Sequence, residues 1–269
     1  KGHGAHPGTG EIVGDAIVAA LAKLGMYGGI FSLVQGGTRA VGEALVTDPR
    51  IKAVGFTGSL GGGRALFDLC AKRPEPIPFF GELGSVNPMF VLPEAAAARG
   101  AELGTGWAGM ADAYRNGARR MSEGAGVKSL LSTACDGRSA APYLFEVSAD
   151  DWMNNEELSE EVFGPLGLVI RVKDAAQMKT LAESFKGQLT ATLQMDDGDI
   201  DLARGLLPVL ERMAGRVLAN GFPTGVEVCD AMVHGGPYPA STNFGATSVG
   251  TLSIRRFLSP VCYQNLPEA

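Results

Sequence analysis

The feature that most constrains this fold is the alternation of helical and extended sequence patterns along the first 72 residues. Apolar residues recur at helical spacing from Ile12 to Leu24, Gly25 ends the run, and Thr9 is the expected helix cap. The following segments are extended at 30–34, helical at 41–47, extended at 51–56 and helical at 60–72. Strands that alternate with helices are typical of βαβ units. We therefore expect an α/β protein with a parallel sheet.

The same two patterns continue through the rest of the chain. Strands are expected at 86–92, 128–132, 144–148, 166–172 and 216–220, and helices from 93 to about 110, at 111–124, at 174–185 and at 199–213. A loop rich in Gly, Pro, Ser and Thr then leads to a final strand or arm at 254–263. With 269 residues, 45% of them hydrophobic, the chain can bury the core of one large domain or two ordinary ones.

Charge and composition exclude several classes of partner. The formal net charge is −6 and no basic stripe is present, so nucleic acid is not expected as a partner. No apolar run approaches the ~18 residues of a membrane span, and the chain opens without the apolar segment of a signal peptide. The four cysteines form no Cys-x-x-Cys pair and the three histidines have no zinc spacing. We expect reduced thiols, no metal site, no membrane partner and a cytoplasmic protein.

A glycine-rich turn is the first candidate for binding. Phe56 ends a strand, Thr57-Gly58-Ser59 follows, and a helix begins near three further glycines at 61–63. Backbone N–H groups at such a helix start, with the Ser59 hydroxyl, are suited to a diphosphate oxygen. The turn is not a Walker loop, because Arg64 stands where lysine is required. An ordinary glycine-rich turn is the alternative.

Two acidic residues are the next candidates. Glu82 lies between Gly81 and Leu83 after an apolar run, where partial desolvation would raise its pKa toward the range of a general base. Glu161 precedes Phe163-Gly164-Pro165, so its carboxylate could accept hydrogen bonds from ribose hydroxyls while the ring packs on a flat heterocycle. The alternatives are a surface turn acid for Glu82 and a helix-end acid for Glu161.

In their order along the chain, these three motifs resemble the signature series of the aldehyde dehydrogenases. The longer stretches 1–9, 78–88, 215–229 and 256–265 are similar to the 2,5-dioxovalerate (α-ketoglutarate semialdehyde) dehydrogenase branch of that family. The resemblance extends over nearly the whole chain. It implies the oxidation of a small semialdehyde, such as 2,5-dioxopentanoate to 2-oxoglutarate, with NAD or NADP through a cysteine thioester.

The resemblance also implies roles for individual residues. Glu82 would activate the water that hydrolyses the thioester. The cofactor would be bound by Lys1 at the adenosine ribose or its phosphate, Ser59 at the diphosphate, Thr57 and Leu83 near the nicotinamide, Glu161 at the nicotinamide ribose, Phe163 close by, and the glycines Gly36 and Gly58. Gly4 stands where many NAD-specific relatives carry a carboxylate, so NADP is compatible with this pocket.

A division into three parts follows from the same resemblance. Residues 1–83 would be the carboxy-terminal part of a Rossmann-like NAD(P)-binding domain, and 84–245 an α/β catalytic domain. Residues 246–269 would be an arm that adds a strand to a neighbouring copy, giving a homodimer or homotetramer.

The match to the family pattern breaks at the nucleophile. Trp107-Ala-Gly-Met110 is followed directly by Ala111, where the resemblance predicts a longer segment carrying the reactive cysteine. Neither Cys70 nor any of the other three cysteines matches that position, and the amino-terminal part of the family fold is also absent from the sequence. The alternative to an enzyme is therefore a truncated, non-catalytic binding or structural protein. An unrelated Rossmann-type reductase would need a proton donor such as Tyr-x-x-x-Lys, which the chain lacks.

Overall fold

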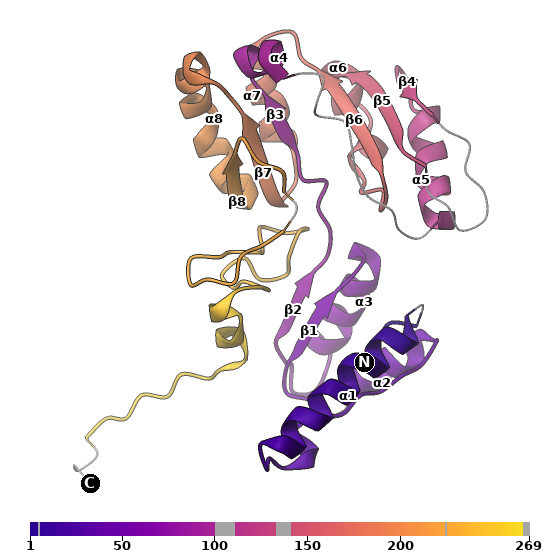
Figure 1. Cartoon of the computed structure of the whole chain (residues 1–269), viewed down its shortest axis with the longest axis vertical. Helices are drawn as coiled ribbons and strands as arrows, with labels where there is room; N and C mark the ends of the chain where they lie inside the picture. The colour runs from indigo at the N-terminus through magenta and orange to yellow at the C-terminus, as the bar shows by residue number, and fades with distance from the viewer. Residues whose placement is uncertain (5, 100–110, 133–140, 224, 266–269) are drawn as a thin grey trace. The chain divides into compact units, whose positions relative to one another are not determined.

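The computed structural model describes residues 1–4, 6–99, 111–132, 141–223 and 225–265. The chain divides into two compact units (Figure 1). Unit 1 consists of Lys1–Phe56 and Gly61–Gly81, and unit 2 of Thr57–Leu60 and Glu82–Ala269. Each unit is described by itself. The predicted junction at 110–111 lies at the edge of a stretch outside the described residues.

Unit 1 contains helices and one small sheet. Its elements are α1 (Pro7–Lys23), the 3-10 helix η1 (Gly28–Ile30), α2 (Arg39–Thr47), β1 (Val54–Thr57), α3 (Leu60–Ala71) and β2 (Phe79–Glu82). Three of these elements cross the boundary by one residue, because Thr57 of β1, Leu60 of α3 and Glu82 of β2 belong to unit 2. The backbone N–H of Val54 donates to Pro78 O at 3.0 Å and that of Gly58 to Glu82 O at 3.1 Å. In both hydrogen bonds the donor and the acceptor are separated by the same number of residues along the chain, which shows that β1 and β2 run parallel. Val46, Cys70 and Phe79 form a buried hydrophobic cluster in this unit.

The helices expected in unit 1 are confirmed, with two corrections nearby. Helix α1 begins at Pro7 with His6 as its cap, so the prediction of a cap at Thr9 was wrong. Proline suits a first turn because its missing N–H would have no partner there. The strand expected at 30–34 was also wrong: Phe31 has extended backbone angles, but no strand is formed in this described stretch. Extended angles become a strand only with a hydrogen-bonded neighbour.

The first sheet of unit 2 is parallel, in the order β3-β7-β8 (Figure 1). Its strands are β3 (Met89–Val91), β7 (Gln188–Gln194) and β8 (Ala214–Ala219), and the helices near it are α4 (Pro93–Arg99), α7 (Ala175–Ser184) and α8 (Ile200–Met213), with the 3-10 turn η3 (Asp197–Asp199). Helices α7 and α8 pack on this sheet through a core that includes Leu206, Leu210 and Ala191. The strand β7 was not predicted.

The second sheet of unit 2 is mixed, in the order β4-β5-β6. Its elements are α5 (Ala111–Glu123), β4 (Lys128–Leu131), β5 (Tyr143–Ser148), α6 (Ala149–Met153), the 3-10 helix η2 (Glu156–Ser159) and β6 (Leu166–Arg171). β5 is parallel to β6 and antiparallel to β4. The α/β class is confirmed, but three small sheets replace the parallel sheet that the alternation predicted.

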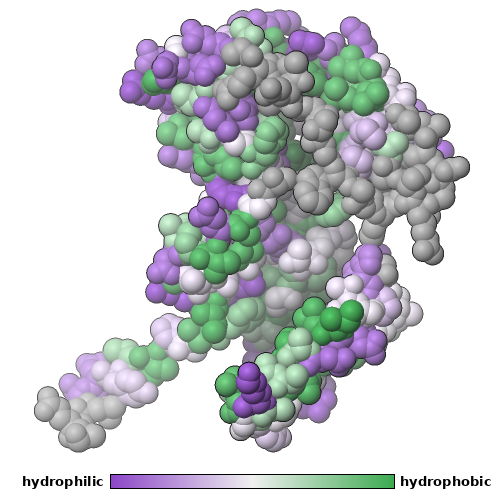
Figure 2. Space-filling view, viewed as in Figure 1, coloured by the Kyte–Doolittle hydropathy of each residue, from purple (hydrophilic) through white to green (hydrophobic). Residues whose placement is uncertain are grey.

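A long loop and a short helix complete unit 2. The 3-10 helix η4 (Thr251–Phe257) overlaps only the beginning of the segment expected as a strand or arm at 254–263. The residues after it have no regular structure as far as Asn265, and Leu258, Val261 and Tyr263 are exposed there (Figure 2). Among the described residues, no helix is both long and apolar enough to cross a membrane. The role of this segment as an oligomerisation arm stays a prediction.

Candidate functional site

Glu82 ends β2, and a loop more than 150 residues further along the chain holds its backbone. Leu83 N–H donates to Ala240 O at 2.8 Å, and Glu82 forms an isolated antiparallel bridge with Ser241. The Glu82 side chain is only 18% exposed. The carboxylate is therefore neither on the open surface nor sealed in the core, which suits a group that exchanges a proton with a small ligand.

Two side chains from the loop contact this carboxylate. Nε2 of His234 lies 3.5 Å from Glu82 Oε1, and the Ser248 hydroxyl donates to Oε2. The two contacting residues are joined to each other, because Ser248 N–H donates to His234 O at 2.8 Å. His234 N–H in turn donates to the Thr247 hydroxyl at 2.9 Å. Both carboxylate oxygens of Glu82 thus have a neighbour on one hydrogen-bonded loop.

These contacts change the direction of the pKa shift expected for Glu82. Burial raises the pKa of Glu82, but the contacts of His234 and Ser248 and the charges of His234 and Arg256 lower it, and the pKa lies below its ordinary value. The expectation that desolvation would raise it overall was wrong, because the sequence does not show that these groups surround the carboxylate. Glu82 is accordingly ionised at neutral pH.

The glycine-rich turn lies beside Glu82. Gly58 N–H donates to Glu82 O at 3.1 Å, so Thr57, Gly58 and Ser59 leave β1 at the end of the strand that neighbours Glu82. Helix α3 begins at Leu60, directly after Ser59. The predicted phosphate turn and the predicted base therefore occupy the ends of two adjacent parallel strands, which is where open α/β sheets bind ligands.

Glu161 approaches the segment that follows Glu82. A side-chain carbon added at Gly84 would lie 2.7 Å from Glu161 Oε2, so this position accepts only glycine without moving the carboxylate. Burial raises the pKa of Glu161, and a single backbone donor, Ser85 N–H, opposes that shift. Glu161 is exposed as a residue, but its carboxylate is partly desolvated and has few donors of its own. The structure places it against the chain two residues beyond Glu82.

Other predicted site residues are placed as follows. Leu83 is 2% exposed, whereas Phe163 is 68% exposed. Lys1 and Gly36 belong to unit 1, where Gly2 N–H donates to Val34 O at 3.0 Å and brings their two segments together. A side-chain carbon at Gly36 would lie 2.6 Å from Val41, so this glycine is required by packing.

The described cysteines offer no activated nucleophile near Glu82. Cys70 is 1% exposed in the core of unit 1, and burial raises the pKa of its thiol, which opposes thiolate formation. Cys229 is partly buried and Cys262 is exposed; neither carries an ion pair or hydrogen bond that would activate it among the described contacts. Cys135 lies outside the described residues.

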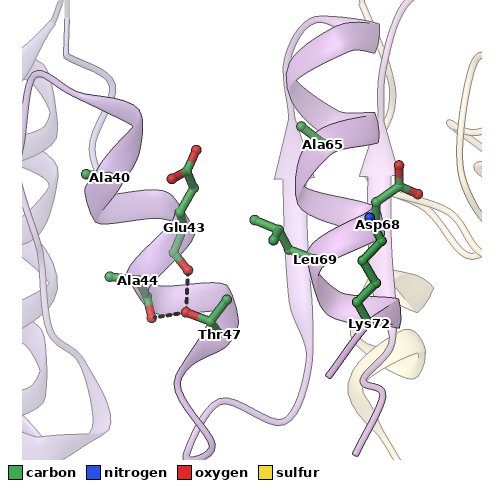
Figure 3. A pocket seen from close by; sticks show the side chains of 8 residues that line it. All are labelled: Ala40, Glu43, Ala44, Thr47, Ala65, Asp68, Leu69 and Lys72. Carbon is green, nitrogen blue, oxygen red and sulfur yellow. Dashed lines mark hydrogen bonds between the residues drawn. The ribbon is translucent and has the colours of Figure 1, made fainter. Parts of the chain in front are cut away.

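A groove of about 660 Å³ lies between α2 and α3 of unit 1 (Figure 3). The Leu69 side chain of α3 points toward α2, and Glu43, Ala44 and Thr47 of α2 line the other side of the groove. None of its lining residues belongs to the predicted site. Within the described ranges, no group of three His, Cys, Asp or Glu residues could hold a metal ion.

Sequence reasoning missed His234 and Ser248. The histidine was considered only as a zinc ligand, and no local pattern connects Ser248 with a carboxylate 166 residues away. The available signal was weak: a histidine that follows Met232-Val233 and precedes Gly235-Gly236 in a loop of small residues. Such a setting indicates a partly buried imidazole, but it does not identify the partner.

Comparison with known proteins gives a consistent result. The aldehyde dehydrogenase family model matches residues 9–109. Over its full length the chain is 45% identical to alpha-ketoglutaric semialdehyde dehydrogenase 2 of Azospirillum brasilense and 41% identical to alpha-ketoglutaric semialdehyde dehydrogenase of Acinetobacter baylyi. The chain spans 60% of the length of each of these relatives.

Solved structures share the fold at lower identity. 1-Pyrroline-5-carboxylate dehydrogenase from Thermus with bound NAD is 21% identical with a TM-score of 0.64, over 83% of this chain and 52% of that one. Glyceraldehyde-3-phosphate dehydrogenase of Methanocaldococcus jannaschii, complexed with NADP, is 21% identical with a TM-score of 0.66, over 83% of this chain and 57% of that one. The chain therefore matches the aldehyde dehydrogenase family in residues 9–109 and is similar over its full length to named dehydrogenases.

Proposed function

We propose that this chain carries the general base and the cofactor-binding part of an NAD(P)+-dependent aldehyde dehydrogenase. The observation that supports this most directly is the position of Glu82. Its partly buried, ionised carboxylate lies at the end of one strand, with the Thr57–Ser59 turn at the end of the next. A carboxylate in this state can take a proton from a water molecule and so make the water a nucleophile.

The residues present in unit 2 fit a nicotinamide dinucleotide. The start of α3 after Ser59 offers backbone N–H groups of the kind that bind diphosphate oxygens. Glu161 is an exposed residue whose partly desolvated carboxylate receives one backbone donor, and ribose hydroxyls would supply further donors. The exposed ring of Phe163 provides an apolar surface close to Glu161 in the sequence. Such a cofactor, when bound, accepts the hydride of an aldehyde oxidation.

We assign Glu82 to the hydrolytic half of the reaction. It would accept a proton from the water that attacks an acyl group held as a thioester, and release of the acid would follow. The nucleophile for that thioester is assigned to positions that this chain does not contain. The alignment with the Azospirillum relative is 320 positions long against 269 residues here, so at least 51 positions have no counterpart in this chain.

The substrate is proposed from the two relatives that match the whole chain. Both are named as alpha-ketoglutaric semialdehyde dehydrogenases, which favours 2,5-dioxopentanoate and its product 2-oxoglutarate. Solved structures of the same fold hold NAD in one case and NADP in another, so we propose a nicotinamide cofactor without choosing between them. A cytoplasmic homodimer or homotetramer completes the proposal, with the segment after Gly250 as the contact between copies.

The test separates the two halves of the reaction. In the natural protein, Glu82→Gln is expected to leave the initial burst of NAD(P)H intact and to lower steady-state turnover by about 100-fold or more. Glu160→Gln is the matched control, since Glu160 is exposed and pairs with Arg120 at the surface. Equal loss of burst and turnover in the Glu82 variant would remove the role assigned to this carboxylate.

A non-catalytic binding or structural protein is the second candidate, and the missing nucleophile is the observation that favours it. The mass of the natural protein distinguishes the two. A polypeptide of 27.9 kDa, the mass of this chain, that forms no NAD(P)H would support the binding protein. A larger polypeptide whose additional residues include a reactive cysteine would support the enzyme.

A further inference from the structure

The neighbourhood of Glu82 contains a histidine for which the proposed function has no role. His234 lies in the loop before Gly235, its side chain is 18% exposed, and its Nε2 lies 3.5 Å from Glu82 Oε1. Its other ring nitrogen, Nδ1, is buried and has no hydrogen-bond partner within the described part of the chain. The Glu82 carboxylate therefore favours a form of His234 that carries a proton on Nε2, because an unprotonated Nε2 and a carboxylate oxygen are both acceptors and would repel each other.

We infer that His234 is a positioning residue for Glu82, whose imidazole orients the carboxylate and whose charge sets how readily that carboxylate takes up a proton. The inference rests on the proposed function, in which Glu82 is the base. His234 is not assigned to contact with the substrate. It acts on the reaction only through the side chain it faces.

The orientation follows from the two unequal contacts of the carboxylate. The Ser248 hydroxyl donates directly to Oε2, whereas the imidazole faces Oε1 from the longer distance of 3.5 Å. A carboxylate oxygen has two lone pairs, so Oε1 keeps one that can accept from a water molecule. Because Ser248 N–H donates to His234 O, the two contacts reach the carboxylate from two hydrogen-bonded positions of one loop.

The effect of charge follows from the groups around Glu82. Those that face it are His234 and Ser248 from the loop and Arg256 from η4. Arginine keeps its charge and serine has none, so His234 is the group among them that can be either charged or neutral. A protonated imidazole stabilises the carboxylate and makes it a weaker base, and a neutral imidazole leaves Glu82 a stronger base.

Two variants of the natural protein test the kinetic part. His234→Gln keeps an N–H donor that cannot titrate, and His234→Leu keeps the volume without a donor. We expect the Gln variant to keep turnover within a few fold while showing a flatter dependence of turnover on pH than the parent protein, because an amide cannot change its charge. The Leu variant should lose turnover by about 10- to 100-fold with an unchanged burst and KM. His6→Gln, in unit 1, is the matched control and should retain the full profile.

A second measurement does not depend on activity. Urea unfolding midpoints of the parent protein, Glu82→Gln, His234→Gln and the double variant are compared at pH 5.5 and 8.5. At pH 5.5 the double variant should lose less than the sum of the single losses, because the pair is broken by either change. At pH 8.5 the difference should shrink. Additive losses at both pH values would overturn the inference, as would a His234→Gln profile identical to that of the parent.

The two proposals fail in different ways. A protein that forms no NAD(P)H, yet shows the coupled loss at pH 5.5, retains the His234–Glu82 pair and loses the dehydrogenase function. A protein with a normal burst and a normal dependence of turnover on Glu82, but with no change in the His234 variants, retains the function and loses the role of His234.

Discussion

At the scale of single residues, the two acids of the candidate site have opposite surroundings, with Glu82 partly buried and Glu161 exposed. The Ser248 hydroxyl and the His234 imidazole contact Glu82, and the charge of Arg256 acts on it. These groups lower the pKa of Glu82 although burial raises it. Glu161 receives one backbone N–H, from Ser85, and burial raises its pKa. Two carboxylates whose pKa values move apart within one site are typical of a division of roles. Here one is prepared to act as a base and the other is prepared to receive donors from a ligand.

This contrast leads to a prediction for Glu161. Its pKa is raised, but the residue is exposed to solvent, so Glu161→Gln should stabilise the protein without ligand only slightly near neutral pH while weakening NAD(P)+ binding by about tenfold. The sign follows from the raised pKa: the gain is absent below the ordinary value of 4.5 and grows as the pH rises above it. Urea unfolding from pH 4 to 8 and calorimetric titration with NAD(P)+ measure both effects.

Glu160→Gln is the matched control for this prediction. Glu160 is the neighbouring acid, half-exposed, and pairs with Arg120 at 3.0 Å, so its removal should change stability little and leave nucleotide binding intact. A Glu161→Gln protein that is less stable than its parent at pH 7, or that binds the nucleotide equally well, would contradict the assignment of Glu161 as an under-supplied carboxylate.

At the scale of elements, β7 is the strand best suited to a stability test, because every residue of it is buried although about half of its residues are polar. Two of its threonines are matched for a test. Thr190 is 1% exposed and its hydroxyl donates to Asn87 Oδ1 at 2.8 Å. Thr192 is fully buried and its hydroxyl has no partner within the described residues. Valine has nearly the same shape as threonine, so each replacement removes a hydroxyl and little else.

The two replacements should therefore have different effects on the free energy of unfolding. Thr190→Val should cost about 1 kcal/mol of unfolding free energy, because a buried hydrogen bond is lost. Thr192→Val should be neutral or stabilising by up to about 1 kcal/mol, because an unpaired buried hydroxyl is removed. Urea unfolding of the two single variants is sufficient to decide. Equal destabilisation would mean that the Thr192 hydroxyl has a partner after all.

The same strand shows how far the sequence alone could go. Helices α2, α3, α7 and α8 were predictable because their apolar periodicity is local. β7 was not, since Gln188 and its neighbours read as polar. The partner of Gln188 Oε1, the Ser85 hydroxyl, lies 103 residues away in sequence and becomes a neighbour only on folding. The site divides in the same way. The turn at Ser59 and the two acids are local patterns, whereas the contacts of His234 and Ser248 with Glu82 are long-range.

At the scale of the whole molecule, the chain builds separate cores within its two units. In unit 1, Val46, Cys70 and Phe79 are the buried centre of one cluster. In unit 2, the largest cluster gathers residues of α8, such as Leu210, around the β3-β7-β8 sheet. The partly buried residues around the unit 1 cluster also come from unit 1 alone. Burial of apolar surface is the main source of stability, so each unit should open with its own free energy.

Hydrogen exchange measured by mass spectrometry can test this separation with one core substitution in each unit. Leu210→Ala and Phe79→Ala each remove a buried side chain and should cost about 2–5 kcal/mol in the affected core. Phe79→Ala is expected to accelerate amide exchange in α2 and α3 and to leave β7 and β8 at the parent rate. Leu210→Ala should do the reverse. Acceleration of both units by either variant would show that the chain opens as one cooperative body, because a local core then determines the exchange of amides that it does not cover.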